Sequence, residues 1–191
     1  VYTYLRLKTR DGETWAATAQ GIVMLAVGRT QPVVELSDQD IRQIAIVPNC
    51  PALAATARGL WQRREAGKWE QVRIQDDVGR VWAESDVRAV AIDAAGNWWI
   101  ATPAGVIRKQ GDRWSFFTGR EGLPHADFTC VATGPGSEVW FGTHRGAVRF
   151  DGKEWAYREG PRWLPGNDVR SIAVGADGRV WFATDKGLGC I

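Results

Sequence analysis

The fold is decided by the stretch Asp168-Val169-Arg170-Ser171-Ile172-Ala173-Val174-Gly175-Ala176-Asp177-Gly178-Arg179-Val180-Trp181-Phe182-Ala183-Thr184-Asp185-Lys186-Gly187. Its two apolar segments, residues 169–174 and 180–184, flank an Asp-Gly turn, which is typical of a β-hairpin. The second half recurs along the chain as a signature of seven residues. It begins with an apolar, usually aromatic, residue and an apolar or small residue, continues with a small residue and Thr, and ends, after two further residues, with Gly. The signature threonines, at spacings of 38, 46, 41 and 41 residues, are Thr18, Thr56, Thr102, Thr143 and Thr184. A period near 40 predicts one supersecondary unit repeated five times.

Each repeat carries the pattern of four short antiparallel strands. In four repeats an Asp opens the first strand sixteen residues before the signature Thr, at Asp40, Asp86, Asp127 and Asp168. A third strand follows the signature Gly, and a fourth follows a turn of the type Gly152-Lys153-Glu154-Trp155. A four-stranded meander of this size is typical of one β-propeller blade. The sequence therefore predicts an all-β propeller of five blades, with repeats at about 1–36, 37–82, 83–123, 124–164 and 165–191.

The fifth repeat stops in its third strand, so we expect the last blade to be incomplete. The chain then forms either one five-bladed domain with a three-stranded blade, or part of a larger propeller that continues beyond Ile191. We favour the second, because an unpaired blade edge is a liability. The chain starts with Val1, and we expect it to be a processed or excised segment.

Most of the eleven tryptophans have an architectural explanation. Four occupy one position on the second strand and three occupy one position on the fourth, where large rings would fill the space between blades. In order, they are Trp15, Trp99, Trp140 and Trp181, then Trp69, Trp114 and Trp155. Of the three cysteines, we expect Cys130 and Cys190 to be buried thiols within strands. The Asp and Thr that begin and end each hairpin are expected to form a cross-strand hydrogen bond.

Composition and motifs argue against several functions. The net charge is +2 and no dense Lys/Arg run occurs, which does not favour nucleic acid as a partner. No apolar stretch is long enough to span a membrane, so no direct membrane insertion is predicted. No phosphate-binding loop, nucleophile elbow or metal-ligand spacing is found. We therefore predict no cofactor, no metal and no catalytic residue.

The stretch from Asp168 to Leu188 resembles the two-component-regulator propeller repeat. The segments Glu121-Gly122-Leu123-Pro124 and Trp163-Leu164-Pro165-Gly166-Asn167 are similar to that family's Gly-Leu-Pro linker. The resemblance implies a β-propeller that is often the extracytoplasmic sensing part of hybrid histidine kinases. It also implies a periplasmic or secreted location in a bacterial-type cell. Some members are appended to secreted carbohydrate-active proteins.

The strongest candidate ligand site lies in the loops of the fourth repeat. His125 precedes its first strand and His144 follows its second, and both positions belong to the same edge of a meander. Arg145 and Arg120 lie in the flanking loops. Such a cluster could bind a carboxylate or polarise a carbonyl, and propellers usually bind ligands through loops.

Two further candidates come from arginine and tryptophan positions. Arg42, Arg88 and Arg170 each follow a first-strand Asp by two residues, so they either line the central channel for an acidic ligand or pair with that Asp. Trp163, in a Pro-containing loop, is either a platform for a sugar ring or packs back onto its blade.

Three functions remain open at this point. The first is a non-catalytic recognition module of a sensor, binding a carbohydrate or peptide on the loop face. The second is the propeller of a secreted polysaccharide-active enzyme or of a lyase, whose chemistry would depend on His125 and His144. The third is a scaffold with a protein partner.

Overall fold

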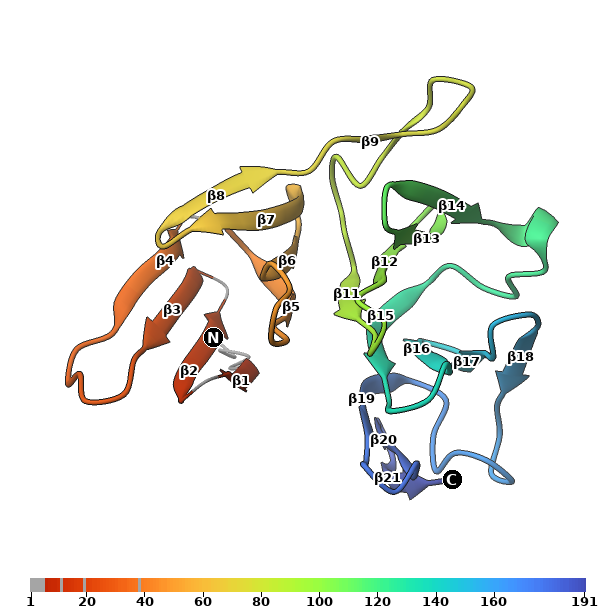
Figure 1. The fold of residues 1–191 in the computed structure, drawn as a ribbon. Coiled ribbons are helices and arrows are strands. Elements are labelled where there is room, and N and C mark those ends of the chain that lie inside the picture. Colours follow the sequence, from red (N-terminus) through yellow and green to blue (C-terminus); the bar gives the residue numbers. More distant parts are fainter. Residues whose placement is uncertain (1–5, 11, 19, 38) are drawn as a thin grey trace. The chain divides into compact units, whose positions relative to one another are not determined.

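The computed structural model describes residues 6–10, 12–18, 20–37 and 39–191 (Figure 1). The chain divides into two compact units, residues 1–90 and 91–191. Each unit is built from short antiparallel sheets in which consecutive strands are neighbours. Such sheets follow from the sequence because β-branched and aromatic residues alternate with turns that contain glycine.

The first unit contains two four-stranded sheets. One consists of β1 (Arg6–Arg10), β2 (Glu13–Thr18), β3 (Gly21–Leu25) and β4 (Val33–Ser37). The other consists of β5 (Ile41–Ala45), β6 (Leu53–Thr56), β7 (Gly59–Glu65) and β8 (Lys68–Gln71). Trp15, Ile22 and Ile44 form part of the core of this unit.

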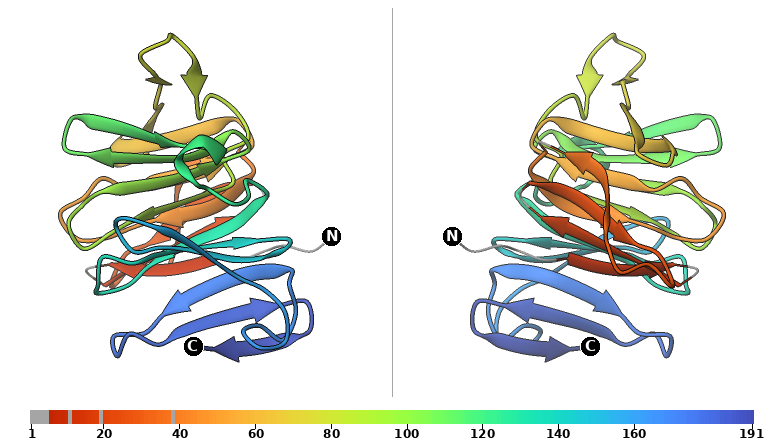
Figure 2. Two further views of the ribbon diagram at one scale, coloured as in Figure 1. Left: turned by 90° about the vertical axis from the view of Figure 1, so that its right-hand side faces the viewer. Right: turned by 90° about the vertical axis from the view of Figure 1, so that its left-hand side faces the viewer.

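The second unit contains the remaining three blade sheets. They are β11 (Ala89–Ile92), which begins at the end of the first unit, with β12 (Trp98–Thr102), β13 (Gly105–Gln110) and β14 (Arg113–Phe117); then β15 (Phe128–Thr133), β16 (Val139–Thr143), β17 (Gly146–Phe150) and β18 (Trp155–Arg158); and then β19 (Val169–Val174), β20 (Val180–Thr184) and β21 (Gly187–Cys190). The last of these sheets has three strands, and Figure 2 shows it in blue from two sides. The predicted all-β propeller fold, with four four-stranded blades and an incomplete fifth, is confirmed.

A small hairpin explains the longest spacing between signature threonines. The strands β9 (Ile74–Gln75) and β10 (Val81–Trp82) form a two-stranded sheet that extends beyond β8 (Figure 1). Asp76 holds this hairpin, accepting hydrogen bonds from the indole of Trp82 at 2.9 Å and from the amide of Arg80 at 2.8 Å. The extra residues are therefore accommodated outside the blade sheets. The sequence did not indicate this hairpin.

The signature Thr stabilises a tight turn rather than the hairpin edge we predicted. In every described repeat its hydroxyl donates to the carbonyl of the signature Gly, at 2.9 to 3.1 Å. The same oxygen accepts from the amide two residues on, for example from Arg145 at 3.1 Å. The predicted Asp–Thr hydrogen bond is therefore wrong. The Thr hydroxyl forms its hydrogen bonds within its own turn, so the Asp side chains can bind other partners.

Burial of the second-strand tryptophans follows the prediction in three of four repeats. Trp15, Trp99 and Trp140 are buried, whereas Trp181 is 40% exposed. Cys130 is buried as predicted, but Cys190 is exposed, because β21 is the edge strand of the three-stranded sheet and most of its residues face solvent. None of the three cysteines, all within the described residues, forms a disulfide.

Candidate functional site

The candidate site is built on the two-residue turn that joins β16 to β17. Thr143 and Gly146 are cross-strand partners, so His144 and Arg145 form the exposed tip of a rigid hairpin. Gly146 has a φ of 141°, and a Cβ there would lie 2.4 Å from the carbonyl oxygen of Arg158. Only glycine fits this position, which explains why the signature ends in Gly.

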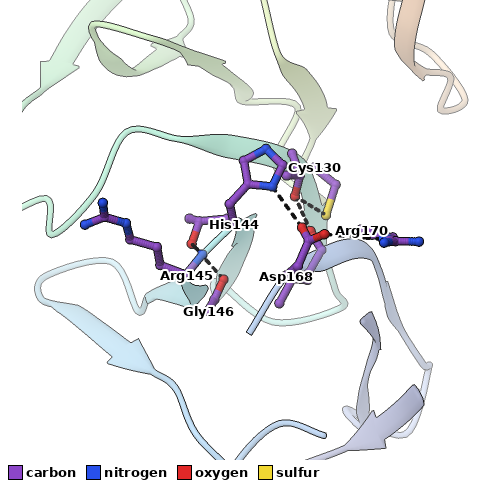
Figure 3. Close-up of polar contacts among 9 residues, drawn as sticks. Cys130, His144, Arg145, Gly146, Asp168 and Arg170 are labelled. Carbon is purple, nitrogen blue, oxygen red and sulfur yellow. Dashed lines mark hydrogen bonds and ion pairs between the residues drawn. The ribbon is translucent and has the colours of Figure 1, made fainter. Parts of the chain in front are cut away.

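Asp168 connects this turn to the next sheet. It lies immediately before β19, and its Oδ1 is 2.8 Å from Nδ1 of His144. Its Oδ2 accepts a long hydrogen bond of 3.4 Å from Nε of Arg170. The backbone carbonyl of Asp168 also accepts from the amide of Asp185 at 3.1 Å, which anchors the residue. One carboxylate thus holds an imidazole and a guanidinium from two adjacent blades (Figure 3).

The side chain of Arg145 points away from the His144–Asp168 pair (Figure 3). It has no hydrogen bond or ion pair to a described residue, and it is exposed. Its backbone carbonyl accepts a hydrogen bond from the hydroxyl of Tyr157 in β18. Burial, together with the carboxylates of Glu159 and Asp127, raises the pKa of Tyr157, so the phenol stays a proton donor.

The same link occurs in the second repeat, where Gln71 takes the place of Tyr157. Its Nε2 donates to the carbonyl of Arg58 at 2.9 Å. A side chain of the fourth strand therefore supports the tip of the turn in both repeats. Tyr157 accordingly serves to fix the turn.

The two histidines have different surroundings. The ring of His125 lies against Tyr157, with 4.8 Å between centroids, while His144 contacts Asp168. Among the described residues no direct contact joins the two imidazoles. Instead, Tyr157 connects His125 to the turn that carries His144. They therefore belong to one edge, as the sequence predicted, but do not form a pair.

The three predicted arginines are all ion-paired, and two of them, Arg88 and Arg170, pair with the Asp two residues before them, which is the second of the two alternatives above. Arg88 pairs with its neighbour Asp86 at 2.8 Å, as Arg170 does with Asp168. Arg42 differs, because it pairs with Asp86, 44 residues further on, rather than with Asp40. Burial alone would raise the pKa of Asp86, but Arg42 and Arg88 outweigh it and hold the pKa below its usual range.

Trp163 and Arg120 lie apart from the Asp168 contacts. Trp163 is half-buried against the core of the last two sheets, and Arg158 covers its ring at 4.6 Å from the centroid. The second alternative for Trp163, packing onto its blade, therefore describes its position. Arg120 is exposed in a one-turn 3₁₀ helix, Gly119–Glu121, which a capping box from Thr118 and Glu121 stabilises.

Asp168 and Asp127 are the residues whose contribution the sequence analysis missed. The sequence predicts that both stabilise their hairpins, because the same residue type recurs in four repeats. Yet Asp168 organises the His144 turn, and Oδ1 of Asp127 is buried without a hydrogen-bond partner among the described residues. The sign in the sequence that could have indicated these contacts is the position of both residues at the start of a first strand, beside the turn that ends the second strand. No cluster of three or more metal-ligating side chains occurs in the described part of the chain.

The blade sheets and their order define the protein as a β-propeller. Residues 164–186 match the family model described as Two component regulator propeller, which confirms the resemblance over the last repeat. No curated protein matches the sequence as a relative. No helix of the described residues is long and apolar enough to cross a membrane.

Solved structures share the propeller fold. The extracellular domain of BT3049 from B. thetaiotaomicron, described as a hybrid two component system, has a TM-score of 0.74 at 24% identity, covering 96% of this chain and 26% of that one. PorZ of Porphyromonas gingivalis, a surface component of the type-IX secretion system, has a TM-score of 0.69 at 15% identity, covering 97% and 32%. YCF48, solved bound to D1 peptide, has a TM-score of 0.69 at 15% identity, covering 100% and 64%.

The chain thus spans a quarter to two thirds of the length of these proteins. It is a propeller domain that resembles the extracellular domains of two-component systems.

Proposed function

We propose that this chain is a non-catalytic recognition module of an extracytoplasmic sensor, and that it binds a carbohydrate or peptide ligand through the edge formed by His144, Arg145, Asp168 and Arg170. The resemblance to extracellular domains of two-component systems supports the sensor setting. The peptide-bound YCF48 structure supports peptides as a ligand class for propellers of this architecture.

One observation carries the proposal. The side chains of His144 and Arg170 are 61% and 66% exposed, and Asp168 holds both of them. Exposed polar side chains normally lose rotamer freedom when a ligand binds, which costs affinity. Here the carboxylate orients the imidazole and guanidinium in advance. A ligand therefore meets hydrogen-bonding groups that are already ordered.

The donor set favours a ligand with a carboxylate. Arg170, oriented by Asp168, and Arg145, whose side chain points away from that residue, each present N–H groups in a planar fork, which matches a carboxylate in two-point contact. With Nδ1 of His144 engaged by Asp168, its Nε2 is the ring nitrogen left for a ligand. Acidic oligosaccharides and acidic peptides both carry a carboxylate, so titrations with each class distinguish which of them is the ligand.

The test is calorimetric titration of the chain with short oligouronates, the matching neutral oligosaccharides, and short peptides with and without Asp or Glu. We expect saturable binding of one acidic class and at least tenfold weaker binding of its neutral counterpart. Arg170→Gln and His144→Ala should each weaken that binding. Binding by neither acidic class would contradict the proposal.

Arg179→Gln is the matched control. Arg179 also lies two residues from an Asp, with Nε 3.4 Å from Asp177, and it is similarly exposed. It precedes β20, at the end of that strand opposite to the Thr184 turn. Its replacement should leave affinity unchanged. Equal losses of affinity in Arg170→Gln and Arg179→Gln would indicate a general effect of charge and not a specific site.

The His144–Asp168 contact also favours a second candidate, a lyase-type enzyme. A carboxylate on Nδ1 fixes the tautomer of an imidazole and leaves Nε2 able to take a proton, as a general base does. In that case, substrate turnover would fall in His144→Ala by a factor of about 100 or more while ligand binding persisted. Loss of binding in that variant, with no turnover in the parent chain, would favour recognition.

A further inference from the structure

A cavity of about 310 Å³ opens at the other end of the third and fourth blades. It lies entirely within the second unit, among the turns that follow β11, β15 and β17. Trp99 and Phe150, 2% and 3% exposed, form its apolar floor, with 5.5 Å between their ring centroids. This volume is at the lower end of the ~300–1,000 Å³ range of small-molecule sites.

The guanidinium that lines this cavity belongs to Arg108, which forms no ion pair with any residue that the structure describes. Arg108 is the cross-strand neighbour of Trp99, and its guanidinium carbon lies 5.6 Å from the centre of that ring. Its Nε is buried without a hydrogen-bond partner within the described residues. Buried N–H groups of charged side chains are normally paired, because losing water without a replacement is costly. Nε of Arg108 is therefore unpaired, in a side chain that lines the cavity.

The next blade shows what the same position looks like when it is satisfied. Arg149 is the cross-strand neighbour of Trp140, and it forms an ion pair with Glu138, two residues before that Trp. In the third blade the residue two before Trp99 is Asn97, which has no charge. The third blade therefore lacks the carboxylate that pairs with Arg149 in the fourth, because Asn97 stands at the position of Glu138.

The carboxylate of Asp93 also lines the cavity but is engaged by its own turn. It accepts from the amides of Ala95 and Asn97 at 3.0 and 2.9 Å, from the side chain of Asn97 at 2.9 Å, and from the indole of Trp99 at 2.9 Å. Four N–H donors use the acceptor capacity of this group. Asp93 therefore stabilises the turn and does not neutralise Arg108 through a direct contact.

We propose that this cavity binds a small molecule that carries a carboxylate on a flat apolar body. The carboxylate pairs with Arg108, and the hydroxyl of Ser137 at the exposed rim supplies a second donor. The apolar body lies over Trp99 and Phe150. This site is separate from the proposed recognition edge, because Ser137 precedes β16 and His144 follows it. The inference does not depend on the proposed function.

The test uses benzoate as the probe and benzamide as its neutral isostere. In ¹H–¹⁵N spectra of the chain, we expect benzoate to shift the indole N–H signal of Trp99 and the Nε–H signal of Arg108, in a saturable manner. Benzamide should bind at least tenfold more weakly, because it lacks the charge. Arg108→Gln should weaken benzoate binding by about tenfold or more.

Arg149→Gln is the control, since it removes a guanidinium from the equivalent position one blade away and should leave benzoate affinity unchanged. Thermal melting of both variants establishes that they are folded. If the 108 variant does not fold, the comparison of benzoate with benzamide on the parent chain still decides the question. Equal binding of the two probes, shifts confined to residues outside the cavity, or no saturable binding would each overturn the proposal.

Discussion

Arg63 donates from Nε and Nη2 to the two carboxylate oxygens of Glu35, at 2.8 Å in each case. Glu35 is only 2% exposed and also accepts from the amide of Gly67 at 3.0 Å. The guanidinium of Arg63 lies 5.0 Å from the ring centre of Trp15. This two-point pair joins β4 to β7, so it connects the first two blades of the first unit.

Removing the charge of Glu35 should destabilise this unit strongly. In Glu35→Gln the partly buried guanidinium of Arg63 loses its counter-charge. Breaking a buried ion pair in this way lowers the free energy of unfolding by about 3–5 kcal/mol. Urea unfolding, followed by tryptophan fluorescence, measures the change. Glu65→Gln, in the exposed pair with Lys68, is the control and should have a much smaller effect. Similar losses in both variants would contradict the assigned role of the buried pair.

Stability should fall in acid in a manner that depends on Glu35. Burial alone would raise the pKa of Glu35, but the hydrogen bonds from Arg63 and Gly67 outweigh it, and the folded-state pKa is lowered below 4.5. A lowered folded pKa means that the stabilisation is complete above the unfolded-state value and is lost as pH falls below it. Melting temperatures between about pH 6 and about pH 3 should therefore decline more steeply in the parent chain than in Glu35→Gln. Parallel declines would argue against the linkage.

Gly146→Ala should destabilise the fourth blade. The φ of 141° is unfavourable for any residue with a Cβ, and the added atom would meet the carbonyl of Arg158 at 2.4 Å. A cost of about 1–3 kcal/mol is expected from the backbone strain, with the clash in addition. Gly152→Ala provides the comparison, because its φ is 104° but no atom lies within 4 Å of a Cβ there. Denaturant melts of the two variants should differ, with the 146 variant less stable.

The hydroxyl of Thr143 should contribute to stability independently of the methyl group. Thr143→Val keeps the shape but removes the bonds to the carbonyl of Gly146 and from the amide of Arg145. A loss of about 1–2 kcal/mol is expected for these buried contacts. Thr143→Ser retains the hydroxyl and should lose less. A serine variant less stable than the valine variant would show that packing, rather than the turn, explains the signature Thr.

Much of the fold could be predicted because its signals are local and repeated. A hairpin of alternating apolar residues around an Asp-Gly turn specifies two neighbouring strands, and a period near 40 residues multiplies the evidence. The strands β5, β15 and β19 begin directly after Asp40, Asp127 and Asp168, as predicted. The prediction was wrong for the third repeat, where β11 begins at Ala89, three residues after Asp86. The β9–β10 hairpin could not be predicted, because it occurs once and has only two residues in each strand.

The candidate site was predictable in its location but not in its contacts. The order of strands in a meander places His125 and His144 at one edge whatever their side chains do. Which partner each ring takes depends on the next blade and on β18, and neither is adjacent in sequence. Thus His144 contacts Asp168, 24 residues away, and His125 contacts Tyr157, 32 residues away.

The strand order, the position of each turn and the need for glycine after the signature threonine follow from the amino-acid sequence alone, since these depend on backbone conformation within a few residues. Which charged groups pair depends on how the blades pack. Arg42 pairs with Asp86 instead of Asp40, and Nε of Arg108 has no hydrogen-bond partner among the described residues, whereas Arg149 pairs with Glu138. The physical reason is that an ion pair depends on distance in space and on burial, and both are set by how one blade lies against the next.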